Sequence, residues 1–313
     1  MHHGRRIGVV IPARNEEEHI VNVLANLPGM VDLAVVVNDG STDKTGELAS
    51  QANAPCEVVV LEGNGDGVGA SIDRGHRHLL DHWEAPFISV VVAGDGQMNP
   101  DDMEALIQPI MANEADHVKG NRALHTEGYN RMPKQRQRAT AVLSWFTTLA
   151  AGQPIGDPQC GYTATCSEVL KAWNWDRSWA GYGYPNYWLI NLAKQGYRLA
   201  EVPVQSIYRN EVSGIKPFSF FCSVGWMMAV EHHRRNIAWL NPRFLAPHTL
   251  FALMAYLLGW SAALPFFTND LEIELVSRGI HPLLLTLFFW MLAHLFDRGA
   301  TRVHRELRLN ATT

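Results

Sequence analysis

Acidic side chains follow three separate apolar runs in the N-terminal third of the sequence. Glu16 follows the first run, Asp39 the second and Asp95 the fourth. A single acidic residue after a strand is usually a helix cap, and Asp43 is best explained in that way. Three such residues, each at the carboxyl end of a predicted strand, would converge on one crevice, because ligands of parallel sheets bind at the carboxyl ends of the strands. The spacing therefore predicts a ligand-binding crevice lined by carboxylates.

Short runs of β-branched and apolar residues predict the buried strands that position these side chains. The runs cover residues 7–11, 33–37, 57–61 and 87–92. Amphipathic stretches predict helices at residues 16–27, 42–51, 69–82 and 100–113. Strands that alternate with helices are typical of a mostly parallel sheet with right-handed crossovers. We therefore expect an α/β domain of Rossmann type, an architecture that binds nucleotides.

Later segments add a helix at residues 136–151, a loop rich in Gly and Pro at residues 152–163, and a strand within residues 198–208. The net charge of −5 gives no basic character, so nucleic acid is excluded as a partner. The four cysteines lack metal-site spacing and fit a reducing cytoplasm. The N-terminus is charged and runs directly into the first strand, so no signal peptide is expected.

The last third of the sequence is apolar. Residues 244–268 contain no Asp, Glu, Lys or Arg, and residues 279–296 contain none either. At 1.5 Å per residue each run can cross a hydrocarbon core of about 30 Å, the second only barely. We therefore predict a hairpin of two transmembrane helices. A pair of buried core helices remains the alternative, since prolines and a histidine interrupt the runs.

Charges around the two runs predict the orientation of the hairpin. Arginines stand on both outer flanks, whereas the connection is acidic; the flanking residues are Arg234, Arg235, Arg243, Arg298, Arg302, Arg305 and Arg308. Basic residues concentrate on the cytoplasmic side of membranes. The protein is therefore expected to be a two-helix membrane protein whose α/β domain is cytoplasmic.

A segment before the first run mixes aromatic and basic side chains. Residues 217–240 suit a helix that lies in the membrane interface, and an ordinary packed helix is an equal alternative. We expect His232 and His233, which adjoin two arginines, to contact lipid headgroups. Metal binding by this pair is not expected, because no partner ligand is spaced nearby in the sequence.

Several motifs occur in an order that resembles glycosyltransferase family 2, and within it the polyprenol-phosphate glycosyltransferases related to dolichol-phosphate mannose synthase. The matching segments are Val9–Glu17, Val37–Asp43, Ala93–Asp101, Gly120–Arg122, Asp157–Gly161, Glu201–Pro203, Tyr208–Arg209 and Ser213–Lys216. The match covers about residues 5–217. It implies a GT-A-like nucleotide-diphospho-sugar transferase domain and transfer with inversion at the anomeric carbon.

The resemblance implies roles for residues on the donor side. The nucleotide-sugar pocket would comprise Pro12, Arg14, Asn15, Glu16, Asp39, Gly67, Gly94 and Asp95. Asp39 would accept hydrogen bonds from the base. Asp95 and Gln97 would hold Mg²⁺ or Mn²⁺, hard cations that take oxygen ligands and bridge a diphosphate. Such an ion would neutralise the charge that develops on the leaving diphosphate.

Three positions depart from the family pattern on this side. Ala93 stands where the first aspartate of the metal motif is expected, so one carboxylate remains where two are common. In the glycine-rich stretch at residues 65–75, Val68 stands in place of a lysine and Asp73 in place of an arginine. We therefore expect lower metal affinity and less positive charge near the donor. A plain strand-to-helix turn would also explain the glycines.

The resemblance also implies an acceptor-phosphate site, formed by Arg122, Arg131, Arg209, Ser213 and Lys216. A phosphate monoester is largely ionised at neutral pH, since its second pKa is about 6. It needs positioning and charge screening rather than a strong base. A sugar hydroxyl would need a base, for which Asp157 is the candidate. Asp95, Asp157 and Arg122 are thus the expected catalytic residues.

The sequence as a whole predicts a transferase domain at residues 1–217, interfacial helices at 218–243 and a membrane hairpin with a basic cytoplasmic tail at 244–313. The expected activity is transfer of a hexose from a UDP- or GDP-linked sugar to a polyprenyl phosphate, undecaprenyl or dolichyl, at the cytoplasmic membrane face. Membrane lipids are expected partners, and a homo-oligomer is left open. Two alternatives remain: transfer to a sugar hydroxyl or glycolipid, and a non-catalytic nucleotide-binding scaffold.

Overall fold

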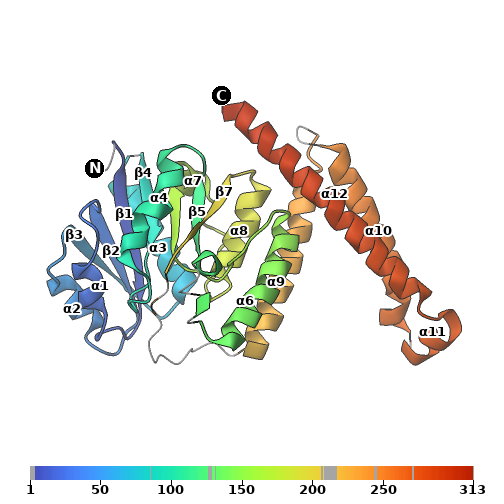
Figure 1. The fold of residues 1–313 in the computed structure, drawn as a ribbon, viewed down its shortest axis with the longest axis horizontal. Coiled ribbons are helices and arrows are strands. Elements are labelled where there is room, and N and C mark those ends of the chain that lie inside the picture. Colours follow the sequence, from blue (N-terminus) through green and yellow to red (C-terminus); the bar gives the residue numbers. More distant parts are fainter. Residues whose placement is uncertain are drawn as a thin grey trace. The chain divides into compact units, whose positions relative to one another are not determined.

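The computed structural model describes residues 4–84, 86–125, 129–130, 132–205, 207, 217–242, 245–269 and 271–312. A seven-stranded sheet lies at the centre of the N-terminal part (Figure 1). Its strands are β1 (Arg6–Ala13), β2 (Leu33–Asp39), β3 (Glu57–Gly63), β4 (Phe87–Val91), β5 (His117–Asn121), β6 (Thr163–Cys166) and β7 (Leu199–Pro203). The four strands predicted first, and the late strand, are confirmed.

The sheet has the strand order β3-β2-β1-β4-β6-β5-β7. All neighbouring strands run parallel except β6, which is antiparallel to both β4 and β5. The mostly parallel α/β architecture is therefore confirmed. Every residue of β2 is buried, so helices and loops cover both faces of this strand. The carboxyl ends of β1, β2 and β4, which carry the predicted site residues, belong to three strands adjacent in the sheet.

The helices of the sheet domain are α1 (Ile20–Ala25), α2 (Thr45–Gln51), α3 (Val68–His82), α4 (Met103–Met111), α6 (Lys134–Ala151), α7 (Ser167–Ala172) and α8 (Tyr184–Lys194), with 3-10 turns η1 (Pro100–Asp102) and η2 (Arg122–Leu124). Helix α3 packs closely on β1, because a Cβ added at Gly8 would lie 2.7 Å from the Leu79 side chain. Helix α1 is shorter than the predicted 16–27. Its N-terminal residues instead form a turn, in which Asn15 adopts a positive φ of 57°.

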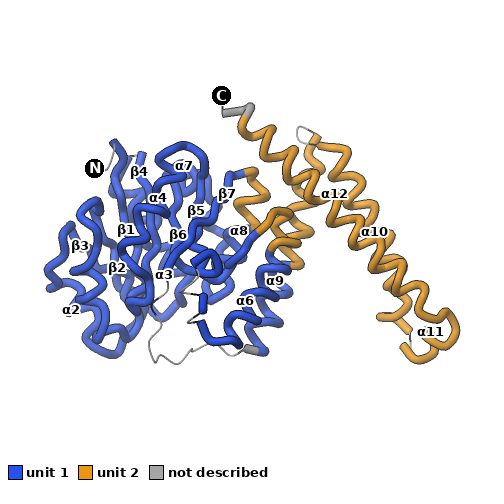
Figure 2. Tube along the Cα trace, in the orientation of Figure 1, with its two compact units in different colours: residues 1–147, 155–189, 197–228 blue, residues 148–154, 190–196, 229–313 orange. Residues whose placement is uncertain are grey.

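The remaining helices are α9 (Pro217–Ala238), α10 (Pro247–Thr268), α11 (Leu271–Arg278) and α12 (His281–Thr312). The chain divides into two compact units (Figure 2), made of residues 1–147, 155–189 and 197–228, and of residues 148–154, 190–196 and 229–313. Helix α9 thus begins in the first unit and ends in the second. This division follows contacts within the fold, and the predicted functional division at residues 217 and 243 stays a prediction.

Helices α10 and α12 pack against each other within the second unit. Ala252, Ala255, Tyr256 and Ala293 form a small buried core between them. Two segments, Pro247–Thr268 and His281–Leu309, are long and apolar enough to cross a membrane, with mean hydropathies of 1.8 and 1.3. Only 33% and 22% of their most apolar windows are buried in the protein. Most of their apolar surface is therefore exposed, unlike that of a core helix in a soluble protein.

Candidate active site

The loops after β1 and β2 are joined by hydrogen bonds that use the predicted motif residues. The Asn15 amide donates to Ser41 Oγ at 3.0 Å, and Asn15 Oδ1 accepts from the Thr42 amide at 2.8 Å. The Glu16 amide donates to Thr45 Oγ1 at 2.7 Å. These bonds hold the first two motifs together as one rigid edge. Asp43 accepts from the Thr45 amide at 3.0 Å at the start of α2, but the N-cap residue is Lys44 and it forms no side-chain cap bond, so Asp43 is not the cap that was expected.

Asp39 lies buried at the end of β2 and holds the glycine-rich loop that follows β3. Its Oδ1 accepts from the amides of Gly65 and Asp66 at 3.0 and 2.9 Å, and its Oδ2 accepts from the amide of Gly67 at 2.8 Å. A carboxylate that receives three backbone N–H groups is strongly anchored. Asp39 therefore fixes the loop conformation, and its role in binding the base stays a prediction.

Gly67 precedes α3 in a conformation that other residues rarely adopt. Its φ is +101°, and an added Cβ would lie 2.7 Å from the Ala180 carbonyl oxygen. The Gly69 amide donates to the same oxygen at 2.7 Å. The glycines thus allow a distant loop to approach α3, which a plain strand-to-helix turn would not require.

Asp73 on α3 holds the same loop, at a position where an arginine is expected. It is buried, and the Ser178 hydroxyl donates to its carboxylate. Burial raises the pKa of Asp73 to about 6, although the Ser178 hydrogen bond and the Arg77 charge lower it. This carboxylate is a structural contact of the loop, so the substitution replaces a cation with an anchored acid.

The predicted metal residues follow β4 in a tight loop. Gly94 lies against β1, because its amide donates to the Pro12 carbonyl at 3.2 Å and an added Cβ would lie 3.0 Å from Ala13 Cβ. Asp95 Oδ1 accepts from the Gln97 amide at 3.0 Å, and the Gln97 carbonyl accepts from the Ile207 amide at 2.9 Å. Asp95 and Gln97 are both half-buried.

This donor set fits a hard divalent cation. Asp95 and Gln97 lie two residues apart and each offers a side-chain oxygen. Mg²⁺ and Mn²⁺ prefer oxygen ligands. Ala93 offers no side-chain ligand, and its amide faces Met98 Sδ at 3.3 Å. The protein would thus supply one carboxylate and one amide oxygen, and the remaining ligands would have to come from the diphosphate and water.

A cleft of about 260 Å³ borders this loop. It is lined by residues of α1 and η1 and by the loop between β4 and η1, including Gly96 and Met98. Among the lining residues described there, none belongs to the predicted donor-binding set. We therefore assign the cleft no role in donor binding.

Asp157 and Arg122 form a two-pronged ion pair. Arg122 Nε donates to Asp157 Oδ2 at 2.6 Å, and Nη2 donates to Oδ1 at 2.9 Å. The Arg122 amide adds a bond to Oδ2 at 3.1 Å. Burial alone would raise the pKa of Asp157, but the hydrogen bonds and charge of Arg122, with the charge of Lys119, hold the pKa below its ordinary value. Asp157 is therefore a carboxylate whose two oxygens already serve Arg122.

Glu201 on β7 fixes the backbone beneath this pair. Its carboxylate accepts from the amides of Gly156 and Asp157 at 2.9 and 3.1 Å, and from Asn121 Nδ2 at 3.0 Å. Glu201 belongs to the sequence motif Glu201–Pro203, so its importance could be recognised from the sequence. Its role in holding the backbone beneath the ion pair was not predicted.

Lys119 was missed altogether. It is fully buried on β5, and its Nζ donates to the Cys160 carbonyl. Burial lowers the pKa of Lys119, whereas Cys160, Asp157 and Glu201 raise it. The sequence offered no usable signal, because the run His117–Asn121 is too short and too polar to predict a strand.

The structure thus brings the predicted donor residues to one edge of the sheet and pairs two of the predicted catalytic residues. Of the predicted acceptor residues, Arg122 is described; Arg131, Arg209, Ser213 and Lys216 lie outside the described residues. Their roles stay predictions.

The family model for Glycosyl transferase family 2 matches residues 8–173, more than half of the 313 residues. The chain belongs to glycosyltransferase family 2. The matched segment contains the loops after β1, β2 and β4 and also the pair Arg122 and Asp157. The family predicted from the motifs is confirmed.

Two relatives are polyprenyl-phosphate enzymes by name. A UDP-N-acetylglucosamine–dolichyl-phosphate N-acetylglucosaminyltransferase of Methanococcus voltae is 28% identical over 217 residues, which cover 64% of this chain and 86% of the relative. An undecaprenyl-phosphate mannosyltransferase of Micrococcus luteus is 27% identical over 209 residues, covering 65% and 84%. These matches make the chain similar to transferases that use a polyprenyl phosphate.

Among solved structures, glucosyl-3-phosphoglycerate synthase from Mycobacterium tuberculosis, in complex with Mn²⁺, UDP and glucosyl-3-phosphoglycerate, matches with a TM-score of 0.53 and 22% identity. The match covers 74% of this chain and 80% of that chain. At this identity the likeness concerns the fold. The sheet domain therefore has a GT-A-like fold, as predicted.

Proposed function

We propose that this protein transfers a hexose, with inversion, from a nucleotide diphosphate sugar to a polyprenyl phosphate at the cytoplasmic face of a membrane, with Mg²⁺ or Mn²⁺ as cofactor. The observation that carries the proposal is the ion pair of Arg122 with the buried Asp157. The pair holds the Arg122 guanidinium rigidly, and both oxygens of the Asp157 carboxylate are already bonded to Arg122, so neither is suited to act as a base. The names of the two relatives support the same acceptor class.

On the donor side, the loop held by Asp39 and the tight loop of Asp95 and Gln97 face one edge of the sheet. We assign the metal to Asp95 and Gln97, where it would supply charge neutralisation for the leaving diphosphate. Asn15 and Glu16 are held by the second motif, so the nucleotide would meet a preorganised pocket.

On the acceptor side, an oxygen of the lipid phosphate attacks the anomeric carbon while the bond from that carbon to the diphosphate oxygen breaks. The nucleoside diphosphate leaves with the bonding electron pair. The nucleophile is already ionised, so the site has to orient it and screen its charge. A guanidinium fixed by two hydrogen bonds suits phosphate oxygens.

The same geometry weighs against a sugar hydroxyl as the acceptor. A general base must have an oxygen within reach of the hydroxyl proton. Both oxygens of Asp157 accept from Arg122, and although burial raises its pKa, the hydrogen bonds and charge of Arg122 hold the pKa below its ordinary value, so the group is a weak base. Asp157 is therefore better suited to position Arg122 than to accept a proton.

Membrane attachment follows from the second unit. Helices α10 and α12 expose large apolar side chains, among them Leu257 at 70% and Met291 at 67%. A lipid would cover such surfaces at low cost. Phe218 and Trp226 of α9 are also exposed, at 84% and 74%, as an interfacial helix requires.

The test uses the full chain purified in detergent, with a panel of UDP- and GDP-sugars and undecaprenyl or dolichyl phosphate. Mass spectrometry of the lipid fraction would show a glycosyl phosphate lipid, formed with Mg²⁺ or Mn²⁺ and lost with chelator or in Asp95→Ala. Metal-dependent donor hydrolysis without a lipid product would overturn the lipid-phosphate acceptor and keep the transferase. No turnover of any donor would favour the scaffold alternative.

A further inference from the structure

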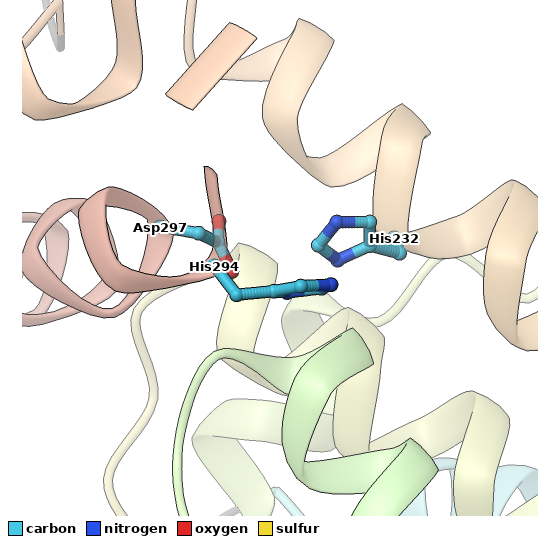
Figure 3. Close-up of side chains that lie close together, drawn as sticks. All are labelled: His232, His294 and Asp297. Atoms are coloured by element: carbon cyan, nitrogen blue, oxygen red, sulfur yellow. The ribbon is translucent and has the colours of Figure 1, made fainter. Parts of the chain in front are cut away.

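A second group of metal-ligating side chains lies in the other compact unit. His232 of α9 and His294 and Asp297 of α12 point toward one another (Figure 3). One potential ligand atom of each residue lies within 4.8 Å of the other two. All three residues belong to residues 229–313, so the cluster forms within one unit. His232 is buried, which shows that its expected contact with lipid headgroups is wrong.

The His232 ring is oriented as in a metal ligand. Its Nδ1 lies 3.2 Å from both Arg235 Nη2 and the Ala150 carbonyl oxygen, and in one of its two tautomers it donates to that carbonyl. In that tautomer the lone pair of Nε2 faces the Tyr256 hydroxyl at 2.7 Å. Histidine ligands commonly donate their other ring N–H to a backbone carbonyl, because this bond fixes both the tautomer and the ring orientation.

Tyr256 of α10 closes the group from a third helix. Its hydroxyl lies 3.1 Å from His294 Nδ1 as well as 2.7 Å from His232 Nε2. The oxygen thus stands between the two imidazoles, where a cation bound to both would meet it. His294 is half-buried, which leaves a route into an otherwise buried site.

Asp297 contributes an oxygen that lacks a partner. The residue is fully buried, and its Oδ2 accepts from Arg235 Nη2 at 2.5 Å. Its Oδ1 has no hydrogen-bond partner among the described residues. Buried carboxylate oxygens are normally satisfied, because an unpaired one costs free energy. Oδ1 is therefore the oxygen available to a ligand.

We propose that His232, His294 and Asp297 form a binding site for a divalent transition-metal ion of the zinc class, with the Tyr256 hydroxyl as the fourth ligand. Two imidazoles with a carboxylate are typical zinc donors. A tetrahedral ion with bonds of about 2.0–2.1 Å places its ligand atoms about 3.4 Å apart. The cluster must therefore contract by roughly 1.4 Å at its widest separation, which side-chain rotation can provide.

Arg235 sets the charge condition for this site. Its guanidinium is buried between Asp297, Thr301 Oγ1 at 2.9 Å and the Ala150 carbonyl at 3.1 Å. This positive charge opposes a cation, so Asp297 alone would not balance the ion. If the ion displaces the Tyr256 proton to solvent, the phenolate and the carboxylate offset two of the three positive charges carried by the ion and Arg235. The ion would then fasten α9 to α10 and α12.

The experiment measures metal content of the full chain in detergent, after stripping and equilibration with Zn²⁺, by elemental mass spectrometry. We expect one bound equivalent in a background in which Asp95, His2 and His3 are replaced by alanine, which removes the donor site and the adjacent terminal histidines. His294→Ala should lose it, with at least about tenfold weaker binding. His281→Ala, the same change at an exposed histidine of the same helix, should keep it.

Two further measurements guard against misfolded variants. Co²⁺ in the same background should give the visible absorption of a tetrahedral ion, which Tyr256→Phe should alter while both imidazoles remain. Zn²⁺ should raise the Tm of the background protein and of its His281→Ala variant, and should not raise that of its His294→Ala variant. A background protein that retains no zinc, or a folded His294→Ala that retains a full equivalent, would overturn the proposal. Neither outcome affects the transferase assay.

Discussion

Replacing Asp157 with asparagine tests the ion pair on which the proposed acceptor site depends. In the wild-type protein each Asp157 oxygen accepts from a different nitrogen of Arg122, at 2.6 and 2.9 Å. Asparagine keeps one acceptor oxygen and presents an NH₂ group where the second oxygen stood. One hydrogen bond then becomes a contact between two donors, and Arg122 loses its counter-charge.

The expected loss of stability follows from the burial of the pair. Removing one partner of a buried ion pair costs about 3–5 kcal/mol when the remaining charge stays buried. Here the Asp157 side chain is 0% exposed and that of Arg122 is 16% exposed, so water can partly solvate the guanidinium. The asparagine also keeps one hydrogen bond. We therefore expect the free energy of unfolding to fall by about 2–3 kcal/mol.

The pH dependence gives a second signature. The pKa of Asp157 is lowered in the folded protein, so its carboxylate stabilises the fold above the unfolded-state pKa of about 3.9. This contribution is lost as the pH falls through the folded-state pKa. The stability difference between wild type and Asp157→Asn should therefore be largest near neutral pH and shrink below about pH 4.

Asp116→Asn is the matched control. Asp116 pairs with Arg198 in the same two-pronged way, with nitrogen–oxygen distances of 2.8 and 3.2 Å, but both side chains are about one-fifth exposed and none of the predicted site residues takes part. Stability is measured by unfolding in detergent, and transfer by steady-state kinetics. Asp157→Asn should lower kcat strongly with little change in the donor KM, whereas Asp116→Asn should leave kcat unchanged. Wild-type kcat in a folded Asp157→Asn would refute the positioning role.

Three further changes probe the loops and the buried lysine. Asp39→Asn should raise the donor KM by at least about tenfold in steady-state assays, because at least one of the three backbone amides of the glycine-rich loop would face an NH₂ group and the others would lose charge assistance. Gly67→Ala should lower Tm and raise the donor KM, since its φ is +101° and Ala180 lies in the way, while Gly29→Ala, with nothing within 4 Å, should change neither. Lys119→Met should lower the free energy of unfolding at neutral pH by about 1–3 kcal/mol, because the Cys160 carbonyl loses its donor and the carboxylates of Asp157 and Glu201 lose a nearby cation. Unchanged unfolding would show that the lysine is dispensable.

The strands that carry the donor residues could be predicted because their signal is local. β1 to β4 are continuous apolar runs, and the acidic motifs follow them directly. β5 and β6 could not be predicted in this way, since one contains Lys119 and the other is only four residues long. Both strands are stabilised by pairing with neighbours that are distant in sequence. Contacts with distant parts of the chain therefore determine β5 and β6, which the local sequence pattern does not predict.

The roles of individual side chains were harder to predict than the elements. Sequence spacing gave no reason to expect a metal ligand near His232, because its potential partners come from another helix more than sixty residues away. Asp39 was expected to bind a ligand, which stays a prediction, and its bonds to three backbone amides were not predicted. In both cases the decisive information is which distant backbone lies within hydrogen-bonding reach, and this depends on packing.

The departures from the family pattern act in opposite directions on the donor. With Ala93, the proposed metal loop has one carboxylate fewer, so an ion held by Asp95 and Gln97 would keep more of its positive charge for the diphosphate. Val68 and Asp73 remove cations from the glycine-rich stretch, and Asp73 is committed to Ser178. Fewer protein cations then neutralise the phosphates. The phosphates would still be neutralised if the metal ion provided more of the positive charge. An ion with fewer anionic protein ligands attracts phosphate oxygens more strongly.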